Sequence, residues 1–211
     1  VRLCMRPVLA GRSRAAIEPM AQQYGLPARV FDLDQPEAVL MGLRGMALVL
    51  HCAGPFSKTA KPMVQACLES GAHYLDITGE IDVFAACSAL DAEAQQRGIV
   101  IMPGAGFDVV PTDCLAAILK LELPSANQLV LAFDAPGGPS PGTAKTAVEG
   151  LGNGGRARID GMLQKVPLAW KTRSFMKNGE ARTAMTIPWG DVFTAYISTG
   201  IANIEVYMCV P

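Results

Sequence analysis

The stretch from residue 46 to residue 80 constrains the fold of this chain more than any other part of the sequence. It opens with an apolar run, residues 46–50, which is too short for a helix and lies between glycines, so we predict a strand buried on both faces. Apolar residues three and four positions apart follow as far as Gly71, which predicts a helix, and residues 73–77 are extended again. Parallel strands joined through a helix need both faces of their sheet covered, so this unit indicates an α/β protein.

Strands and helices continue to alternate through the first half of the chain. We predict the last turn of a helix at residues 1–5 and strands at residues 7–10, 28–33 and 99–102. We predict helices at residues 14–24, 34–45, 82–97 and 112–121, with Pro19 expected to interrupt the first and Asp34 to cap the second. Alternation of this kind predicts a Rossmann-like, doubly wound and largely parallel sheet.

The pattern changes beyond residue 124. We predict a strand at residues 128–133, a loop rich in Pro and Gly at 135–142, a helix at 143–151, and β-structure near residues 183–187 and 204–208. The sequence therefore predicts two domains. Residues 1–124 form the Rossmann-like domain, and residues 125–211 form part of an α+β second domain.

The first strand of the expected sheet is missing from this sequence. In the dinucleotide-binding arrangement the first strand is central, and the turn after it holds a Gly-rich loop. Residues 7–10 form the first predicted strand of this chain, and we interpret it as the second strand of that arrangement. We therefore expect a fragment that is inactive by itself. Either the strand at residues 7–10 pairs directly with the strand at residues 46–50, or a gap leaves backbone groups unpaired on both sides.

The composition excludes several classes of partner. The chain is 50% hydrophobic and 18% charged with a formal net charge of -1, and its Lys and Arg residues are scattered, so we expect no nucleic acid partner. None of its 6 cysteines stands in a C-x-x-C pair, which indicates reduced, packed thiols. No apolar run is long enough for a transmembrane segment, and we predict a cytoplasmic protein.

Candidate binding residues follow the first two predicted strands. Gly11, Arg12 and Ser13 come directly after residues 7–10, where an acidic residue would bind a ribose hydroxyl and a basic one a ribose 2′-phosphate. Arg12, supported by Ser13 or Arg14, offers the fork-shaped donors that suit a phosphate, although a solvated loop arginine is an equal alternative. Asp32, after the second strand, would either contact an adenine or cap the next helix.

A further candidate turn follows residues 46–50. It comprises Ala53, Gly54, Pro55 and Phe56. Glycine in this turn permits a ligand to approach the backbone closely, and Phe56 would pack on a ribose or nicotinamide. The alternative is a turn that needs Gly and Pro only for its geometry. Its place at the carboxyl end of a parallel strand favours binding.

Two more pairs of candidates lie after the later strands. Gly79 and Glu80 follow residues 73–77 and either orient a ligand or cap the next helix. Phe107 and Asp108 belong to a G-x-G turn that lacks the third glycine of a dinucleotide loop. We interpret this turn as a loop over the nicotinamide end, with Asp108 or Asp113 as a helix cap.

Other chemistries lack the residues they need. His51 lies inside a predicted buried strand, His73 lies at a strand start, and no G-x-S-x-G motif occurs, so a Ser-His-Asp hydrolase is poorly supported. The Cys and His residues do not have the spacing of zinc ligands, so we predict no metal. No catalytic residue can be assigned, because Cys52 is more typical of a packed thiol than of a nucleophile.

Four motifs, in the order in which they occur, resemble one known family. They are residues 10–12 (AGR), 51–56 (HCAGPF), 74–80 (YLDITGE) and 103–113 (PGAGFDVVPTD). The chain resembles the saccharopine dehydrogenase-like oxidoreductases, in the branch that includes bacterial trans-acting enoyl reductases. Segments at residues 188–192 and 194–207 also resemble that branch, so the resemblance covers nearly the whole chain.

The resemblance implies an NADP-binding Rossmann domain followed by an α+β domain that shapes a substrate cleft. By that resemblance, Arg12 and Ser13 would bind the 2′-phosphate, residues 53–56 the nicotinamide ribose and pyrophosphate, and residues 79–80 and 107–108 would form the cleft floor. It implies hydride transfer to a small-molecule or lipid-like carbonyl or enoyl substrate, and a homodimer formed through the second domain. The alternative is a non-catalytic nucleotide-binding or scaffold module with the same fold.

Overall fold

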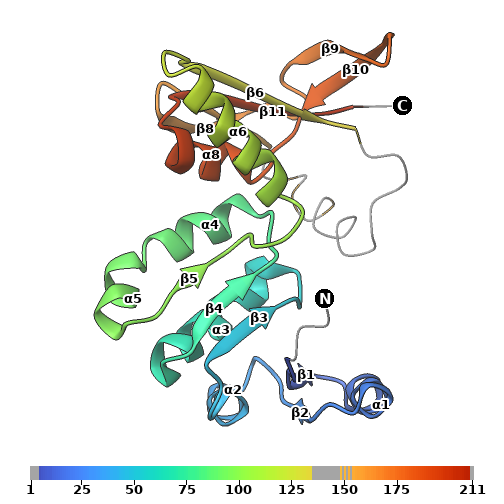
Figure 1. The fold of residues 1–211 in the computed structure, drawn as a ribbon, viewed down its shortest axis with the longest axis vertical. Helices are drawn as coiled ribbons and strands as arrows, with labels where there is room; N and C mark the ends of the chain where they lie inside the picture. Colours follow the sequence, from blue (N-terminus) through green and yellow to red (C-terminus); the bar gives the residue numbers. More distant parts are fainter. Residues whose placement is uncertain (1–4, 135–147, 149, 151, 153, 210–211) are drawn as a thin grey trace. The chain divides into compact units, whose positions relative to one another are not determined.

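The computed structural model describes residues 5–134, 148, 150, 152 and 154–209, and these residues fall into two compact units (Figure 1). The first unit contains Val1–Asp76 and Leu90–Met102, and the second contains Ile77–Ala89 and Pro103–Pro211. The chain therefore passes from one unit to the other more than once. The predicted domains, 1–124 and 125–211, stay a prediction.

The first unit is built from short parallel sheets and helices, as the alternation predicts. Its elements are β1 (Leu9–Gly11), α1 (Arg14–Tyr24), β2 (Ala28–Val30), α2 (Pro36–Leu43), β3 (Leu48–His51), α3 (Phe56–Ser70), β4 (His73–Asp76), α5 (Asp91–Arg97) and β5 (Ile101–Met102). β1 pairs with β2 in one parallel sheet, and β3, β4 and β5 form another in that order.

The two sheets of the first unit are not joined by backbone pairing. Of the two outcomes expected for a missing strand, direct pairing between β1 and β3 is wrong, because within the described residues β1 pairs only with β2 and β3 only with β4. Among the described residues, β1 and β3 therefore each have one edge that pairs with no other strand. Backbone groups at such edges need other partners when they are buried.

The β3–β4–β5 sheet is covered on one face only, which corrects the prediction of strands buried on both faces. Leu48, Leu50 and Met102 are 50%, 58% and 49% exposed. On the opposite face, His51 of β3 and Tyr74 and Asp76 of β4 are buried, and α3 packs against these two strands. The described residues place no helix over the other face, so the apolar side chains there meet solvent.

Three predictions about helices are also wrong. α1 continues through Pro19, because a proline removes only one intrahelical hydrogen bond and the helix end is held by Gly25 in the left-handed conformation. α2 is capped by Gln35 rather than by Asp34. The predicted helix at 82–97 is two helices, α4 (Ile81–Ser88) and α5, because the chain passes from the second unit to the first between them.

The second unit is a mixed sheet with helices packed on one of its faces. Its remaining elements are α6 (Val110–Glu122), β6 (Gln128–Phe133), β7 (Gly155–Ile159), β8 (Met162–Val166), β9 (Thr172–Lys177), β10 (Glu180–Thr186), α8 (Asp191–Thr199) and β11 (Asn203–Cys209). The sheet order is β8-β7-β11-β10-β9, and β6 pairs with β11 in parallel. Leu129, Leu131, Ile204 and Val206 form its core with Ala116 of α6 and Val192 of α8.

The prediction at residues 128–133 is confirmed by β6, whereas β7, β8, β9 and α8 were not predicted. The predicted helical turn at 1–5 lies outside the described residues except for Met5, which is in no helix. The predicted loop at 135–142 and most of the predicted helix at 143–151 also lie outside them. Among the helices that the structure describes, none has the length and apolar character of a membrane span.

Candidate functional site

Arg12 occupies the turn between β1 and α1 and is exposed. Within the described residues its guanidinium has no hydrogen-bond or ion-pair partner, whereas the neighbouring Arg14 pairs with Glu18 one helical turn later. Ser13 is the N-cap residue of α1, but its side chain makes no capping bond. Both predicted phosphate ligands therefore keep their donor groups available.

Asp32 is half-buried just after β2. One of its carboxylate oxygens accepts a hydrogen bond from the backbone N–H of Asp34 at 3.2 Å, and its carbonyl accepts the N–H of Gln35 at 3.3 Å. The side chain thus stabilises the turn that leads into α2 without being its N-cap. A contact with adenine stays a prediction.

The turn of residues 53–56 connects β3 to α3 and is held by hydrogen bonds at its base. The Thr59 hydroxyl donates to the carbonyl oxygen of Ala53 at 2.5 Å, and the carbonyl of Pro55 accepts the N–H of Lys58 at 3.1 Å. The bond between Gly54 and Pro55 is cis. Ala53 and Gly54 are exposed, so the backbone at the end of β3 is accessible.

The fold itself does not require a glycine at position 54. Gly54 does not have a positive φ, and a Cβ atom built on it would lie 3.6 Å from the nearest atom of the Phe56 ring, which is an ordinary contact. Gly11 is different, because a Cβ there would lie 2.7 Å from Ile17. A glycine with free space around it is what close approach of a ligand to the backbone requires.

His51 lies beneath this turn, and sequence reasoning gave it no role. It is 4% exposed, and its ring meets the Phe56 ring edge-to-face with centroids 5.5 Å apart. Burial lowers the pKa of His51, against the opposing charge of Asp76. The neighbouring Tyr74 donates its hydroxyl to Asp76 at 2.7 Å. His51 therefore supports Phe56 as a neutral, packed ring.

Four of the predicted site residues belong to the second unit: Gly79, Glu80, Phe107 and Asp108. A Cβ on Gly79 would lie 3.3 Å from a carboxylate oxygen of Asp108, so these two residues are in contact. Glu80 is the N-cap residue of α4, and its N–H donates to the Thr78 hydroxyl at 3.0 Å. Phe107 is 88% exposed. Burial raises the pKa of Asp108.

The predicted caps of α6 are wrong. Its N-cap residue is Val109, with no side-chain capping bond. The backbone carbonyl of Asp108 accepts a hydrogen bond from the indole N–H of Trp189 at 2.7 Å. Asp113 accepts the Ser198 hydroxyl of α8 at 2.6 Å. Trp189, which lies between β10 and α8, and Ser198 of α8 had to fold back onto this region, which no local pattern in the sequence indicates.

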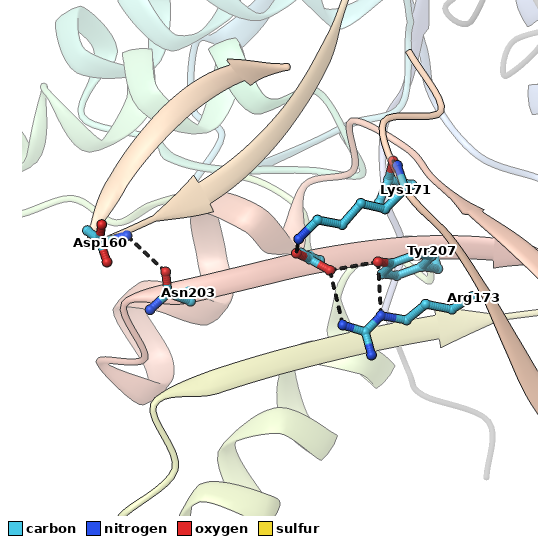
Figure 2. A network of polar contacts seen from close by, with 7 residues as sticks. Asp160, Lys171, Arg173, Asn203 and Tyr207 are labelled. Carbon is cyan, nitrogen blue, oxygen red and sulfur yellow. Dashed lines mark hydrogen bonds and ion pairs between the residues drawn. The ribbon is translucent and has the colours of Figure 1, made fainter. Parts of the chain in front are cut away.

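A charged cluster on the second unit also escaped sequence reasoning, which described the basic residues as scattered. Lys171 and Arg173 both pair with Glu205, and Tyr207 donates its hydroxyl to Glu205 at 2.6 Å (Figure 2). Burial opposes the charge of Glu205, but the hydrogen bonds from Lys171 and Tyr207 prevail and lower its pKa. The cluster lies on the sheet face away from α6 and α8, by the register of β9, β10 and β11.

The structure thus divides the predicted site between the two units. Gly11, Arg12, Ser13, Asp32 and residues 53–56 belong to the first, and residues 79–80 and 107–108 belong to the second. Within the second unit Gly79 and Asp108 are brought together. Convergence of all these residues on one groove stays a prediction.

The first unit is similar in sequence to a known protein family. Residues 2–102 match the family model described as the saccharopine dehydrogenase NADP binding domain. This part of the chain is similar to that domain family. The chain is also 29% identical over 168 residues to the saccharopine dehydrogenase-like oxidoreductase of Mus musculus, which covers 71% of this chain and 39% of that protein. It is 37% identical over 119 residues to the trans-acting enoyl reductase of Mycobacterium leprae (strain TN), covering 51% and 27%.

A solved structure supports the fold over almost the whole length. Apo saccharopine dehydrogenase (L-Glu forming) from Saccharomyces cerevisiae superposes with a TM-score of 0.67 at 15% identity, covering 97% of this chain and 49% of that one. The Rossmann-like α/β fold and the resemblance stated from the motifs are confirmed. The chain spans about two fifths of the length of the curated mouse relative.

Proposed function

We propose that the protein is an NADP-dependent oxidoreductase that transfers a hydride to a small or lipid-linked carbonyl or enoyl group. The family of residues 2–102 is an NADP-binding domain, and the relatives named above are oxidoreductases and an enoyl reductase. The 211 residues would supply most of the nucleotide-binding half and part of the substrate-binding half. The homodimer and the cytoplasmic location stay predictions from the sequence.

The main support for this proposal is the position of Arg12 and its available guanidinium. In dinucleotide-binding folds, an acidic side chain after the second strand binds the ribose hydroxyl of NAD, whereas an arginine there accommodates the 2′-phosphate of NADP. Arg12 directly follows β1, and its guanidinium has no partner within the part of the chain that the structure describes, which supports this role. A planar guanidinium binds a phosphate through paired hydrogen bonds.

The remaining residues fit the other parts of the same cofactor. The free space at Gly54 suits close approach of a pyrophosphate or ribose, and Phe56 is braced by the His51 ring for packing on the nicotinamide ribose. NADP(H), when bound, supplies the hydride. Because hydride transfer depends mainly on the positions of donor and acceptor, these residues act by binding and orientation.

Titration with NADPH and NADH tests the proposal. We expect quenching of protein fluorescence or enhancement of nicotinamide fluorescence, with a lower Kd for NADPH than for NADH. The protein should be expressed with any coding sequence that flanks these 211 residues. Binding of neither nucleotide would remove both the oxidoreductase and the nucleotide-binding module as functions, and a preference for NADH would remove the role of Arg12.

Substitution of Gly54 by Ala tests the place of the cofactor. We expect NADPH binding to weaken by about 5- to 150-fold, because an added methyl group that must be accommodated costs about 1 to 3 kcal/mol. Thermal unfolding should stay nearly unchanged, since among the described residues a Cβ at position 54 meets no atom closer than 3.6 Å. Loss of stability with unchanged NADPH affinity would contradict the prediction.

A further inference from the structure

The turn that begins α8 holds the start of α6 at two points. Trp189 donates its indole N–H to the carbonyl of Asp108 at 2.7 Å, and the side chain of Asp191 lies against Thr112, with 2.5 Å between the two oxygens. Gly190 allows this approach, because a Cβ there would lie 3.1 Å from Val109 and 2.7 Å from Phe84. The conformation of residues 108–112 therefore depends on both bonds.

Asp191 is buried in a way that disfavours its charged form. The residue is 0% exposed, and among the described residues its Oδ2 atom has no hydrogen-bond partner. An ionised carboxylate with an oxygen buried and unpartnered is costly, whereas the carbonyl oxygen of a neutral acid tolerates the same surroundings at much lower cost. The geometry of this one oxygen favours a proton on Asp191.

The charged groups on the elements that pack against α8 do not offset the burial. They are Asp113, Lys120 and Glu122 of α6 and Asp108 before it, Arg156 and Arg158 of β7, Glu80 and Asp82 at the start of α4, and Glu205 of β11. Lys120 donates to the carbonyls of Pro124 and Ala126. Arg158 donates instead to the carbonyls of Val192 at 2.8 Å and Gly161 at 2.7 Å. In the part of the chain that the structure describes, Asp191 has no ion pair.

The hydroxyl of Thr112 gives an independent reason to place a proton on Asp191. Its oxygen lies 3.0 Å from the carbonyl oxygen of Val109 and 2.5 Å from Oδ1 of Asp191, and both of these are acceptors when Asp191 is ionised. A hydroxyl has one hydrogen and can donate to only one of them. Both bonds form together if Asp191 carries a proton, because Asp191 then donates to Thr112 and Thr112 donates to Val109.

We propose that Asp191 is a positioning residue that acts as a neutral carboxylic acid: it donates its proton to Thr112 and thereby holds residues 107–109 in their binding conformation. Its importance for cofactor binding rests on the proposed function, in which Phe107 and Asp108 lie at the nicotinamide end. The proton itself does not depend on that function. Loss of the proton places a charge between α6 and α8 and loosens the turn.

The direction of the pH dependence follows from the burial. Burial, with the charges of Asp113 and Asp108 added, raises the pKa of Asp191 from 3.8 to about 6, although a hydrogen bond donated by Thr112 to the ionised carboxylate would lower it. Because the folded state then binds more protons than the unfolded state between about pH 4 and 6, stability falls as the pH rises through that window. A carboxyl with a lowered pKa would give the opposite slope.

The direct test is a titration of the Asp191 carboxyl carbon by NMR in the unchanged protein without nucleotide. We expect a midpoint near pH 6, and a midpoint at or below the ordinary 3.8 would overturn the proposal. Asp191→Asn should remove part of the fall in melting temperature between pH 4 and 7. Asp113→Asn, the matched control on α6, should keep most of it.

The role of Asp191 in positioning is tested by NADPH affinity measured across the same pH range. Relative to Asp191→Asn, we expect the affinity of the unchanged protein and of Asp113→Asn to weaken as the pH rises through 6, because ionisation of the NADPH 2′-phosphate in the same range affects all three proteins alike. Equal pH dependence in all of them would overturn the positioning role. If NADPH does not bind at all, the proposed function fails, while the NMR titration still decides whether Asp191 holds a proton.

Discussion

Replacement of Arg12 by Ala is expected to weaken NADPH binding by about 10- to 150-fold and to leave NADH binding unchanged. The 2′-phosphate is the only chemical difference between the nucleotides, and hydrogen bonds to a charged group contribute about 1.5 to 3 kcal/mol. Arg12 has its donors available, because no partner for its guanidinium exists among the described residues. Fluorescence titration with both nucleotides measures the effect.

Arg14→Ala is the matched control for this prediction. Arg14 lies two positions further along the same turn and is exposed, but its guanidinium already pairs with Glu18. Its removal should change NADPH affinity by less than about fivefold, because surface ion pairs and distant charges are worth less than about 1 kcal/mol. Equal effects of the two substitutions would show that general positive charge, rather than a specific contact, attracts NADPH.

Gly104→Ala is expected to destabilise the second unit by about 2 to 5 kcal/mol. Gly104 has a φ of 73°, and a Cβ there would lie 2.5 Å from the Phe84 ring. The left-handed conformation costs a residue with a Cβ about 1 to 2 kcal/mol, and overpacking costs about 1 to 3 kcal/mol more. Phe84 cannot easily yield, because it is 3% exposed and stacks on Phe193. Thermal or urea unfolding measures the loss.

Gly71→Ala separates the two contributions to that loss. Gly71 ends α3 with a φ of 75°, and a Cβ there would meet no atom of the described residues within 4 Å. It carries the conformational cost without the clash, so we expect a loss of about 1 to 2 kcal/mol. If both variants lost the same stability, the packing of residue 104 against Phe84 would contribute nothing.

Local patterns were sufficient for most elements of the first unit. Apolar runs between glycines located β3 and β4, and the Gly residues after α1, α3 and α5 marked helix ends, because a left-handed C-cap is a local requirement. The same patterns identified residues 11–13, 53–56, 79–80 and 107–108, since strand ends in an α/β sheet can be counted along the chain. The family resemblance came from these turns.

Burial and long-range polar contacts could not be predicted in the same way. The apolar residues of β3 predict burial, but Leu48 and Leu50 are exposed, because burial depends on which element packs over a face. The break between α4 and α5 depends on the passage of the chain between units. β7 to β9 have too many polar side chains for a clear alternating pattern, and their antiparallel partners hold them in the sheet.

The order of strands, turns and helices in the first half, and with it the place of Arg12, follows from spacing and residue type alone, because turns and caps are interactions between near neighbours. The environment of Asp191 does not. Its partner Thr112 lies 79 residues earlier in the chain, so the contact exists only after α6 and α8 have packed together. Burial, rather than the identity of the residue, raises the pKa of this aspartate to about 6, and burial is a property of the folded chain.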